Sequence, residues 1–447
     1  MPPSNVQPAR GTRDFLPADV RRREYVIRVV RDVYERYGFE PLETPAFENI
    51  ETLQGKYGEE GNRLIFKILK RGEHESSGEV DLALRYDLTV PLARVVAQYQ
   101  NELPKFFKRY QIQPVWRADR PARGRFREFF QCDIDAIGST SLVVEAELLG
   151  AVCEVMARLG FQDFVVRLNH RRLLSGILEQ AGLPPAQHGD ALISIDKLDK
   201  LDRDKVTADM VARGIDATTA VRCLDAFVRP PCAGDADLLR SLTATLPPDG
   251  GGARAVAEVQ DLLRLCEATP AAGRIRLDLG LARGLSYYTG AIMEIAVPDL
   301  AGSLGGGGRY DNLIGMFLGR DVPACGFSLG LERIIVVMTE RKMFPESVER
   351  GAVDVMVTVW NDDSRADALG LAADFRQAGL RADVYPEADK LGKQFKYAAA
   401  RNIPWVAVLG DDERSHANVS LKDLQSGQQH TVARAEAAQY VRTRRPE

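Results

Sequence analysis

The spacing of apolar residues changes several times along the chain, and each change predicts a different element. From Asp19 to Tyr37, apolar side chains recur every three or four residues, which predicts an amphipathic helix that stops at Gly38. Two strand-like stretches, Lys105–Trp116 and Phe126–Ile137, flank a turn rich in Arg, Pro and Gly. This pattern is typical of a long β-hairpin. The first block, residues 1–165, is therefore expected to combine helices with such a hairpin.

Residues 166–270 have a different character, because they are rich in Leu, Ala, Asp and Arg with helical spacing. We interpret them as a mostly helical insertion, whose last helix follows a linker at Pro247–Gly252. Strand character returns over Arg274–Thr339, which ends with a helix expected at Leu331–Thr339.

Strand and helix patterns alternate from Ala352 onward, which predicts a compact α/β domain with a largely parallel sheet. The whole chain is thus divided into a first domain of residues 1–340 with its insertion at about 166–270, a linker at 341–351, and an α/β domain at 352–447. The expected elements of the second domain are strands at Val353–Val359, Ala382–Tyr385, Trp405–Leu409, Val419–Leu424 and His430–Val432, with helices at Ala366–Ala378 and Lys393–Arg401.

Composition narrows the class of protein. The 447 residues are 45% hydrophobic, as in folded globular proteins. No apolar run approaches the roughly 18 residues of a membrane span, and the start at Met1 lacks the pattern of a secretory signal. The six cysteines form no C-x-x-C pair and the five histidines no H-E-x-x-H pattern, so we expect neither disulfides nor a metal site. A reducing, cytoplasmic location fits these features.

Charge is distributed unevenly along the chain. There are 59 basic and 63 acidic residues, a net charge of −4, which by itself argues against a nucleic-acid partner. Within Lys105–Glu128, however, eight basic residues face only Asp119 and Glu128, a local charge of +6. Guanidinium groups donate paired hydrogen bonds to phosphate oxygens, so the turn suits a polyphosphate or a nucleic-acid backbone. The alternative is a solvated arginine-rich loop.

The strand after the turn favours a binding site. Side chains alternate between the faces of a strand, so Phe129, Gln131, Asp133 and Asp135 share one face with Arg127. The other face carries apolar side chains and is expected to be core. An aromatic ring, an amide and two carboxylates beside arginines predict the floor of a pocket. The residues of the apolar face are Phe130, Cys132, Ile134 and Ala136.

Two later segments also suggest contact with a ligand. Leu281–Gly290 contains Arg283 followed by Tyr287 and Tyr288, and adjacent tyrosines in a strand would point to opposite faces, so at most one is expected to face the pocket. Gly305–Asp311 begins with four glycines, which suggests a loop whose backbone lies against a ligand. Neither a Walker pattern nor a Rossmann fingerprint is present.

The sequence also contains a pattern from another class of enzyme. Gly326–Gly330 matches G-x-S-x-G, the nucleophile elbow of α/β-hydrolases, with Ser328 as nucleophile and His416 or His430 downstream. The βα alternation of that fold is missing before residue 350, and the hypothesis leaves the arginines of the hairpin unexplained.

In combination, these segments resemble the histidyl-tRNA synthetases, a family of class II aminoacyl-tRNA synthetases. The three class motifs and two segments that separate this family from other class II members match in order over nearly the whole chain. The segments are Arg10–Asp14 at the family's opening, Thr44–Pro45 in motif 1, Phe107–Gln131 in motif 2, Leu281–Tyr288 and Gly307–Asp311 as the two separating motifs, and Gly326–Arg333 in motif 3.

The resemblance implies an α+β catalytic domain built on an antiparallel six-stranded sheet with helices, a helical insertion, and a C-terminal α/β anticodon-binding domain. It implies a two-step reaction, in which histidine and ATP give histidyl-adenylate and the terminal ribose of histidine tRNA then takes the histidyl group. Mg2+ would accompany the ATP phosphates, bound through phosphate oxygens and few protein ligands. A homodimer is implied by motif 1.

Residue roles are implied in the same way. Arg117 would grip the α-phosphate, and Arg283 would contact that phosphate and the histidine carboxylate. Both are the implied catalytic residues. The implied histidine-binding residues are Asp87, Thr89, Arg117, Gln131, Asp135, Arg283, Tyr287 and Tyr288, and the implied ATP-binding residues are Arg117, Asp119, Arg125, Phe129 and Arg333.

Two questions remain within the resemblance: whether the chain is the enzyme or a regulatory paralogue, and which branch of the family it is most similar to. A regulatory paralogue that activates ATP phosphoribosyltransferase shares the catalytic fold but lacks the anticodon domain; the tail from Ala352 and the intact Arg283 favour the enzyme. The segments Tyr86–Pro91 and Gln131–Asp135 are similar to the eukaryotic-type branch, with Asp87 where many bacterial members have Glu. This similarity leaves open how the extra 5′ guanosine of histidine tRNA is read.

Overall fold

The computed structural model describes residues 6–72, 77–199, 201–227, 234–282 and 287–444. It contains two compact units. One comprises Met1–Asp14 with Arg23–Met343, and the other comprises Phe15–Arg22 with Phe344–Glu447. Each unit is described by itself.

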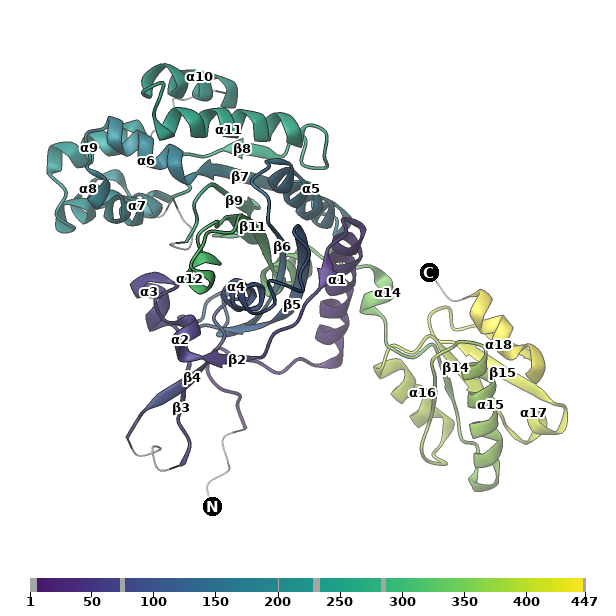
Figure 1. Cartoon of the computed structure of the whole chain (residues 1–447). Helices are drawn as coiled ribbons and strands as arrows, with labels where there is room; N and C mark the ends of the chain where they lie inside the picture. Colours follow the sequence, from purple (N-terminus) through teal and green to yellow (C-terminus); the bar gives the residue numbers. More distant parts are fainter. Residues whose placement is uncertain (1–5, 73–76, 200, 228–233, 283–286, 445–447) are drawn as a thin grey trace. The chain divides into compact units, whose positions relative to one another are not determined.

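The first unit is built on an eight-stranded sheet (Figure 1). Its six central strands pair antiparallel, as the sequence predicts, and β1 and β8 add a parallel strand at each edge. The α+β fold class is thus confirmed. In spatial order the strands are β1 (Glu40–Pro41), β5 (Phe107–Trp116), β6 (Glu128–Ile137), β11 (Ala324–Gly330), β10 (Gly305–Arg309), β9 (Ala291–Ala296), β7 (Val165–His170) and β8 (Ile275–Leu277).

The predicted hairpin is formed by β5 and β6. Its register pairs Phe107 with Ile137 and Trp116 with Glu128, so the turn spans the arginine-rich residues between Trp116 and Glu128. The expected core face of β6 is buried at Cys132 and Ile134, but Asp133 and Asp135 on the opposite face are also nearly inaccessible. β6 therefore lies at the centre of the protein, with a polar interior on one side.

Helices and a small second sheet accompany the large sheet in this unit. α5 contacts β6 and β11, and α13 contacts β6, while α4 follows Asp87 directly. The helices are α1 (Pro17–Arg36), α2 (Ile50–Leu53), α3 (Gly58–Arg63), α4 (Thr89–Gln98), α5 (Val143–Arg158), α12 (Gly315–Leu318) and α13 (Leu331–Glu340), and the three-stranded sheet consists of β2 (Phe47–Asn49), β4 (Val80–Leu84) and β3 (Lys67–Leu69).

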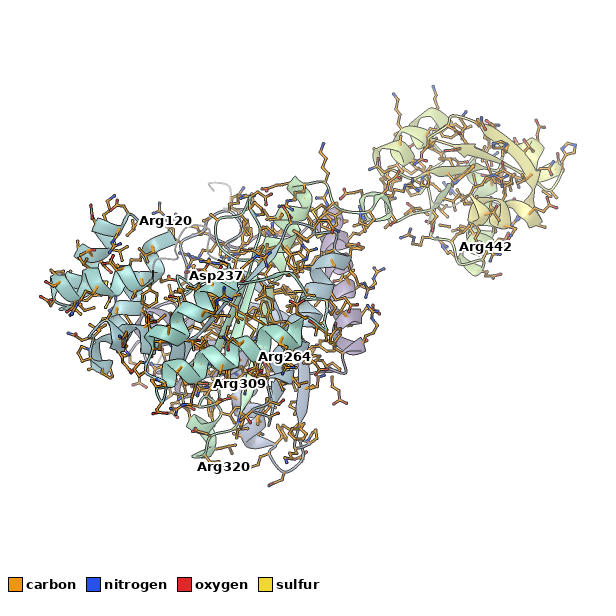
Figure 2. All side chains as sticks on the ribbon, turned by 90° about the horizontal axis from the view of Figure 1, so that it is seen from above. Arg120, Asp237, Arg264, Arg309, Arg320 and Arg442 are labelled. Carbon is orange, nitrogen blue, oxygen red and sulfur yellow. The ribbon has the colours of Figure 1, made fainter. Side chains whose placement is uncertain are left out.

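The helical insertion is shorter than the sequence predicts. Residues 166–170 belong to β7, where β-branched Val165 and Val166 and alternating burial favour a strand over a helix. Helices then run from Arg171 to Cys266, and α6 and α11 lie side by side (Figure 1). Figure 2 shows Asp237 and Arg264 among the side chains on the exposed faces of these helices. The helices are α6 (Arg171–Gln180), α7 (His188–Ile195), α8 (Arg203–Ala212), α9 (Ala217–Ala226), α10 (Asp235–Thr245) and α11 (Gly251–Cys266).

The second unit contains a five-stranded sheet in the order β13, β12, β14, β15, β16. The sequence predicts a largely parallel sheet, but only the pairs β12–β13 and β12–β14 are parallel. The last two pairs are antiparallel because the connections before β15 and β16 are too short for a crossover. The elements are β12 (Val355–Val357), β13 (Ala382–Val384), β14 (Trp405–Val408), β15 (Asn418–Asp423), β16 (Gln429–Ala433), α14 (Glu346–Glu349), α15 (Arg365–Gln377), α16 (Leu391–Ala400), α17 (Asp411–Ser415) and α18 (Arg434–Thr443).

Two further properties concern the whole of the described chain. None of its helices has the length and apolar character that crossing a bilayer requires. The five cysteines that are described are free and buried.

Candidate active site

A cavity of about 310 Å3 opens on one face of the central sheet. It is bounded by the hairpin turn, by the start of α4 and by strands β9, β10 and β11. A smaller hollow of about 20 Å3, which contains Asp133 and Asp135, shares six of the cavity's residues. The residues of the cavity that were singled out in the sequence are Asp87, Thr89, Arg117, Asp119, Arg125, Phe129, Gln131, Tyr287, Tyr288 and Arg333.

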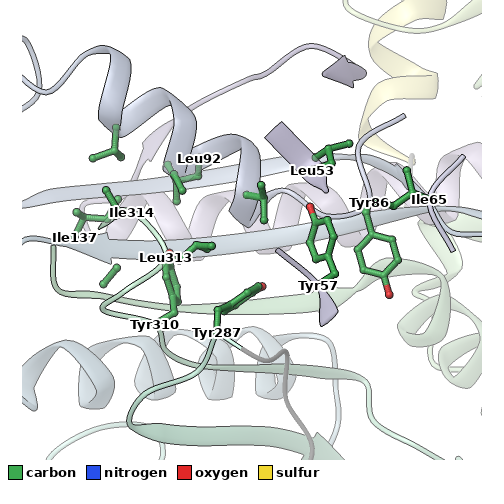
Figure 3. Packing of buried hydrophobic residues seen from close by; sticks show 14 of the residues in the cluster. Leu53, Tyr57, Ile65, Tyr86, Leu92, Ile137, Tyr287, Tyr310, Leu313 and Ile314 are labelled. Carbon is green, nitrogen blue, oxygen red and sulfur yellow. The ribbon is translucent and has the colours of Figure 1, made fainter. Parts of the chain in front are cut away.

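Asp87 provides a buried negative group at one end of the cavity. Its Oδ1 accepts hydrogen bonds from the Tyr57 hydroxyl at 3.0 Å and from the Val90 amide at 3.1 Å, and its Oδ2 accepts one from the Tyr287 hydroxyl at 3.3 Å. Burial raises the pKa of this carboxyl, and the amide bond and the charge of Arg117 oppose the rise. Both tyrosines belong to one cluster of buried hydrophobic residues, seen in Figure 3. They hold the carboxylate in a fixed orientation.

Asp135 lies in the smaller hollow and pairs with a buried arginine. Arg109 Nη2 is 2.8 Å from Asp135 Oδ2 and 4.0 Å from Asp133 Oδ2, so two carboxylates share one guanidinium. The Tyr310 hydroxyl donates a hydrogen bond to Asp135 Oδ1. Burial raises the pKa of both aspartates, and Arg109 opposes the rise. Asp135 Oδ2 meets Arg109 outside hydrogen-bond geometry and has no hydrogen-bond donor, so it can accept a hydrogen bond from a ligand.

Gln131 provides a second buried acceptor. Its Nε2 donates to Ser328 Oγ at 2.7 Å, whereas its Oε1 is buried without a hydrogen-bond partner. Ser328 lies within β11 and not on a strand-to-helix turn. The hydroxyl of Ser328 accepts a bond from an amide, and no histidine is among the residues described around the cavity. The geometry therefore contradicts the hydrolase hypothesis, which requires a base beside the serine.

The two tyrosines at positions 287 and 288 correct one expectation. Both line the cavity and the hollow, although the sequence predicts that only one faces the pocket. They lie outside any strand, so the alternation of faces does not apply. The rings meet edge to face, with centroids 5.3 Å apart.

The glycine-rich segment is also different from its prediction. Gly305–Arg309 is not a loop but the strand β10, in the centre of the sheet. A Cβ at Gly307 would lie 2.2 Å from the Gly326 carbonyl oxygen, and one at Gly326 would lie 1.9 Å from Asp135 Oδ1. The missing side chains leave room for the carboxylate and for the floor of the cavity.

Three of the described arginines line the cavity, and one of them, Arg117, is close enough for its charge to act on Asp87. Arg117 donates from Nε to the Tyr86 carbonyl at 3.0 Å, and its guanidinium lies 4.3 Å from the ring centre of Tyr86 and 5.2 Å from that of Phe129. Arg125 pairs with Asp119 at 2.5 Å. Arg333 Nη1 donates to the Ser303 carbonyl at 2.6 Å. These arginines form the arginine end of the cavity and can donate hydrogen bonds to several phosphate oxygens. The ring of Phe129 lies beside Arg117.

Glu332 is a buried acid on the wall of the cavity. Its Oε2 accepts the Phe130 amide at 2.9 Å, which ties α13 to β6 beside Phe129. Burial raises the pKa of Glu332 to about 7, against the lowering effects of that amide and of the charges of Arg13 and Arg23.

Comparison with known proteins decides the family. A family model described as "Histidyl-tRNA synthetase" matches residues 11–334, and one described as "Anticodon binding domain" matches residues 353–444. The chain belongs to the histidyl-tRNA synthetase family. A "Histidine--tRNA ligase" of Gloeobacter violaceus is 42% identical, over 96% of this chain and 97% of that protein.

Solved structures of histidyl-tRNA synthetases agree with this assignment. The one from a species of Nostoc is 33% identical and has a TM-score of 0.83, covering 99% of this chain and all of that one. A chain from Bacillus halodurans, described as an "ATP phosphoribosyltransferase regulatory subunit/histidyl-tRNA synthetase", has a TM-score of 0.74 at 22% identity and shows only that the fold is shared.

Three buried residues at the site of this histidyl-tRNA synthetase family member were not predicted from the sequence. Arg109 and Tyr310 hold Asp135, and Glu332 holds the strand of Phe129. Arg109 could have been found, because a hairpin whose turn is centred near residue 122 places Arg109 opposite Asp135, as observed. Tyr310 and Glu332 come from elements about 175 and 200 residues further along the chain, so no local pattern connects them with β6.

Arg283, the implied catalytic residue, lies outside the described residues, as do its neighbours up to Ser286. Within the described chain, no group of three or more His, Cys, Asp or Glu residues is arranged to hold a metal ion. Besides Asp87, the carboxylates that line the cavity among the described residues are Asp119, Glu294 and Glu332.

Proposed function

We propose that this protein is a histidine–tRNA ligase, which activates L-histidine with ATP and transfers it to the 3′ end of histidine tRNA. The observation that carries the proposal is one cavity with a carboxylate end and an arginine end, which meet where the charge of Arg117 acts on Asp87, in a chain whose relatives are named for this activity. One end presents buried carboxylates and an amide, and the other presents arginines. These ends suit an amino acid with a cationic ammonium group and a polyphosphate.

The histidine substrate would occupy the carboxylate end. Asp87, Thr89 and Gln131 would receive the ammonium group, because Asp87 is held as an acceptor and Gln131 Oε1 has no hydrogen-bond partner. Asp135 and the pair Tyr287 and Tyr288 would contact the imidazole. A site whose polar groups are left unpaired by an apolar analogue rejects that analogue strongly.

ATP would occupy the arginine end. Arg117 would bind the α-phosphate, Arg125 and Arg333 the outer phosphates, and Phe129 would stack on adenine, with Asp119 holding Arg125 in place. Mg2+ bound to the phosphates would neutralise part of their charge. Within the described residues no cluster of His, Cys, Asp or Glu could hold a metal, which fits a metal that is held mainly by its substrate.

Both steps need positioning and charge neutralisation more than a protein nucleophile. A histidine carboxylate oxygen forms a bond to the α-phosphorus, and the bond from that phosphorus to the bridging oxygen breaks, which releases pyrophosphate. The ribose hydroxyl oxygen then attacks the acyl carbon, AMP leaves, and the hydroxyl proton is released. Arg117, with Arg283, would stabilise the negative charge that develops in both steps.

The remaining proposals concern the whole chain. Residues 1–340 would be the catalytic domain, with an insertion whose helices lie within Arg171–Cys266. Residues 341–351 would be a linker, and 352–447 the anticodon-binding domain that contacts tRNA. The enzyme would act as a homodimer in the cytoplasm, with the segment at Thr44–Pro45 near the dimer interface.

The test is histidine-dependent exchange of pyrophosphate into ATP by the purified protein, followed by charging of histidine tRNA. Exchange that requires histidine and is not supported by other amino acids would support the proposal. A folded protein that binds histidine but catalyses no exchange would contradict it and favour a regulatory role.

A further inference from the structure

The segment Arg10–Arg13, which precedes the first helix, lies across the base of the hairpin turn. The Arg127 amide donates to the Gly11 carbonyl at 2.8 Å, and Arg127 Nη1 lies 3.3 Å from the Arg10 carbonyl oxygen, to which it donates. Arg127 is the last residue before β6, so the segment is attached where the turn joins the floor of the cavity.

Gly11 allows this crossing because of its backbone and its lack of a side chain. Its φ is +85°, a region that favours glycine. A Cβ at this position would lie 2.8 Å from Arg127 Cγ, 2.9 Å from Arg127 Cδ and 3.0 Å from Pro121 Cγ. Both the backbone and the space therefore require glycine here.

The contacts continue from this crossing into the nucleotide end of the cavity. The Arg117 amide donates to the Arg127 carbonyl at 2.9 Å, and Arg127 Nε donates to the Asp119 carbonyl at 3.1 Å. Arg127 thus connects Gly11 to Arg117, the residue proposed to bind the α-phosphate. Two hydrogen bonds separate the segment from this residue.

A second connection runs through Arg13. Its guanidinium lies 4.2 Å from the ring centre of Phe126, a residue that lines the cavity. The charge of Arg13 also favours the ionised form of Glu332, whose carboxylate holds the Phe130 amide.

We infer that Arg10–Arg13 is a positioning segment for the nucleotide end of the site, acting through Arg127 on Arg117 and through Phe126 on the cavity wall. The inference rests on the proposed function in one respect: the nucleotide is ATP. Arg10–Arg13 contributes no group to the reacting atoms, and the carboxylate end of the cavity makes none of the contacts described for it.

The test compares how each variant changes the kinetic constants for the two substrates, ATP and histidine. In pyrophosphate exchange, Gly11→Ala and Arg13→Ala should raise the ATP KM by about tenfold or more, because small displacements of positioned groups cost about one to two orders of magnitude in rate. The histidine KM should stay within about twofold. Arg13→Lys, which keeps the cation, should recover part of the loss. Gly38→Ala is the matched control, since Gly38 has a φ of +76° with no atom within 4 Å of an added Cβ.

Binding measurements keep the inference separate from the proposed function. The affinity for a fluorescent ATP analogue should fall in Gly11→Ala and Arg13→Ala, and the affinity for histidine, measured by calorimetry, should not. Unchanged ATP parameters in both variants, or equal losses for both substrates, would overturn the inference. If the wild-type protein showed no histidine-dependent exchange, the proposed function would be overturned. The role of Arg10–Arg13 would still be tested by comparing the nucleotide affinity of the variants with that of the wild type.

Discussion

Individual buried charges determine the character of the site. Arg109 is fully buried and lies near both Asp133 and Asp135, so two buried carboxyl groups share one guanidinium. A buried carboxylate without a full set of donors is costly. A ligand that supplies an N–H group to Asp135 Oδ2 would satisfy it, and we therefore propose that this residue discriminates between substrates.

Replacing Asp135 should affect histidine selectively. Asp135→Asn removes the charged acceptor but keeps the volume, and a hydrogen bond to a charged group is worth about 1.5–3 kcal/mol, or roughly tenfold to a hundredfold in affinity. We expect the histidine KM to rise by that factor and the ATP KM to change by less than about twofold. Steady-state exchange kinetics measure both, and Asp237→Asn on the exposed face of α10 is the control. Equal increases in the two KM values would contradict the role of Asp135.

The acid Glu332 should make stability depend on pH. Its pKa is raised from 4.5 to about 7 in the folded protein, so the unfolded chain ionises this group at a lower pH than the folded chain does. The free energy of unfolding is therefore expected to fall between about pH 4.5 and 7 and to stay level above that range. A tenfold difference in proton affinity is worth about 1.4 kcal/mol, so the total loss is on the order of 3 kcal/mol.

Glu332→Gln isolates this effect, because the amide oxygen can still accept the Phe130 N–H while the ionisation is removed. The stability of the variant relative to the wild type should increase through the same pH range, as measured by urea denaturation at several pH values. A difference between the two proteins that does not depend on pH would show that ionisation of Glu332 is not the cause.

Individual strands show which parts of the fold the sequence reveals. The β5–β6 hairpin follows from alternation and a turn rich in Pro and Gly, and the residues of its polar face are the ones that line the site. β10 could not be predicted, because glycine has little preference for strands and its function here is to leave space. Tyr310 and Glu332 were missed for another reason, since their partners on β6 lie far away in the sequence.

The glycines that pair β10 with β11 should be intolerant of substitution. Gly326→Ala would place a methyl group 1.9 Å from Asp135 Oδ1, so the carboxylate or the strand must move. We expect a loss of about 1–3 kcal/mol of stability, as is usual for overpacking, together with an increased histidine KM. Urea denaturation and exchange kinetics check the two effects.

Gly189→Ala is the matched control for this prediction. Gly189 lies in the helix α7, and an added Cβ would have no atom within 4 Å. That variant should be neutral or more stable by about 0.5–1 kcal/mol. A Gly326→Ala protein with normal stability and histidine KM would show that the strand pair adjusts more easily than these distances imply.

The charge of the whole molecule is less polarised than the hairpin suggests. The +6 counted over Lys105–Glu128 ignores partners from elsewhere: Glu147 pairs with Lys108, Glu340 with Arg123, and Asp135 with Arg109. Counting charges along a sequence window cannot detect carboxylates that folding brings to it. Arg120, by contrast, is exposed at the turn (Figure 2).

Binding of tRNA should therefore depend on salt, but less than eight cations would imply. Each phosphate contact contributes about 0.7–0.9 to the slope of log affinity against log salt concentration. We expect a slope that corresponds to only part of the hairpin's cations and that decreases by about one contact in Arg120→Ala. Filter binding of histidine tRNA over a range of salt concentrations measures it. Affinity that does not change with salt would contradict a contribution of phosphate contacts.

The pairing of β6 with β11 has a consequence for the order of events during synthesis. Gln131 pairs with Gly330, so the floor of the cavity cannot close until about 200 more residues have left the ribosome, which at 5–20 residues per second takes roughly 10–40 s. Over that interval the edge of β6 that pairs with β11 has no partner strand. The helices of Arg171–Cys266 can form meanwhile from local contacts. The catalytic floor is thus assembled late in the biogenesis of the first unit, and a nascent chain arrested before Gly330 would carry an unpaired strand edge at its centre.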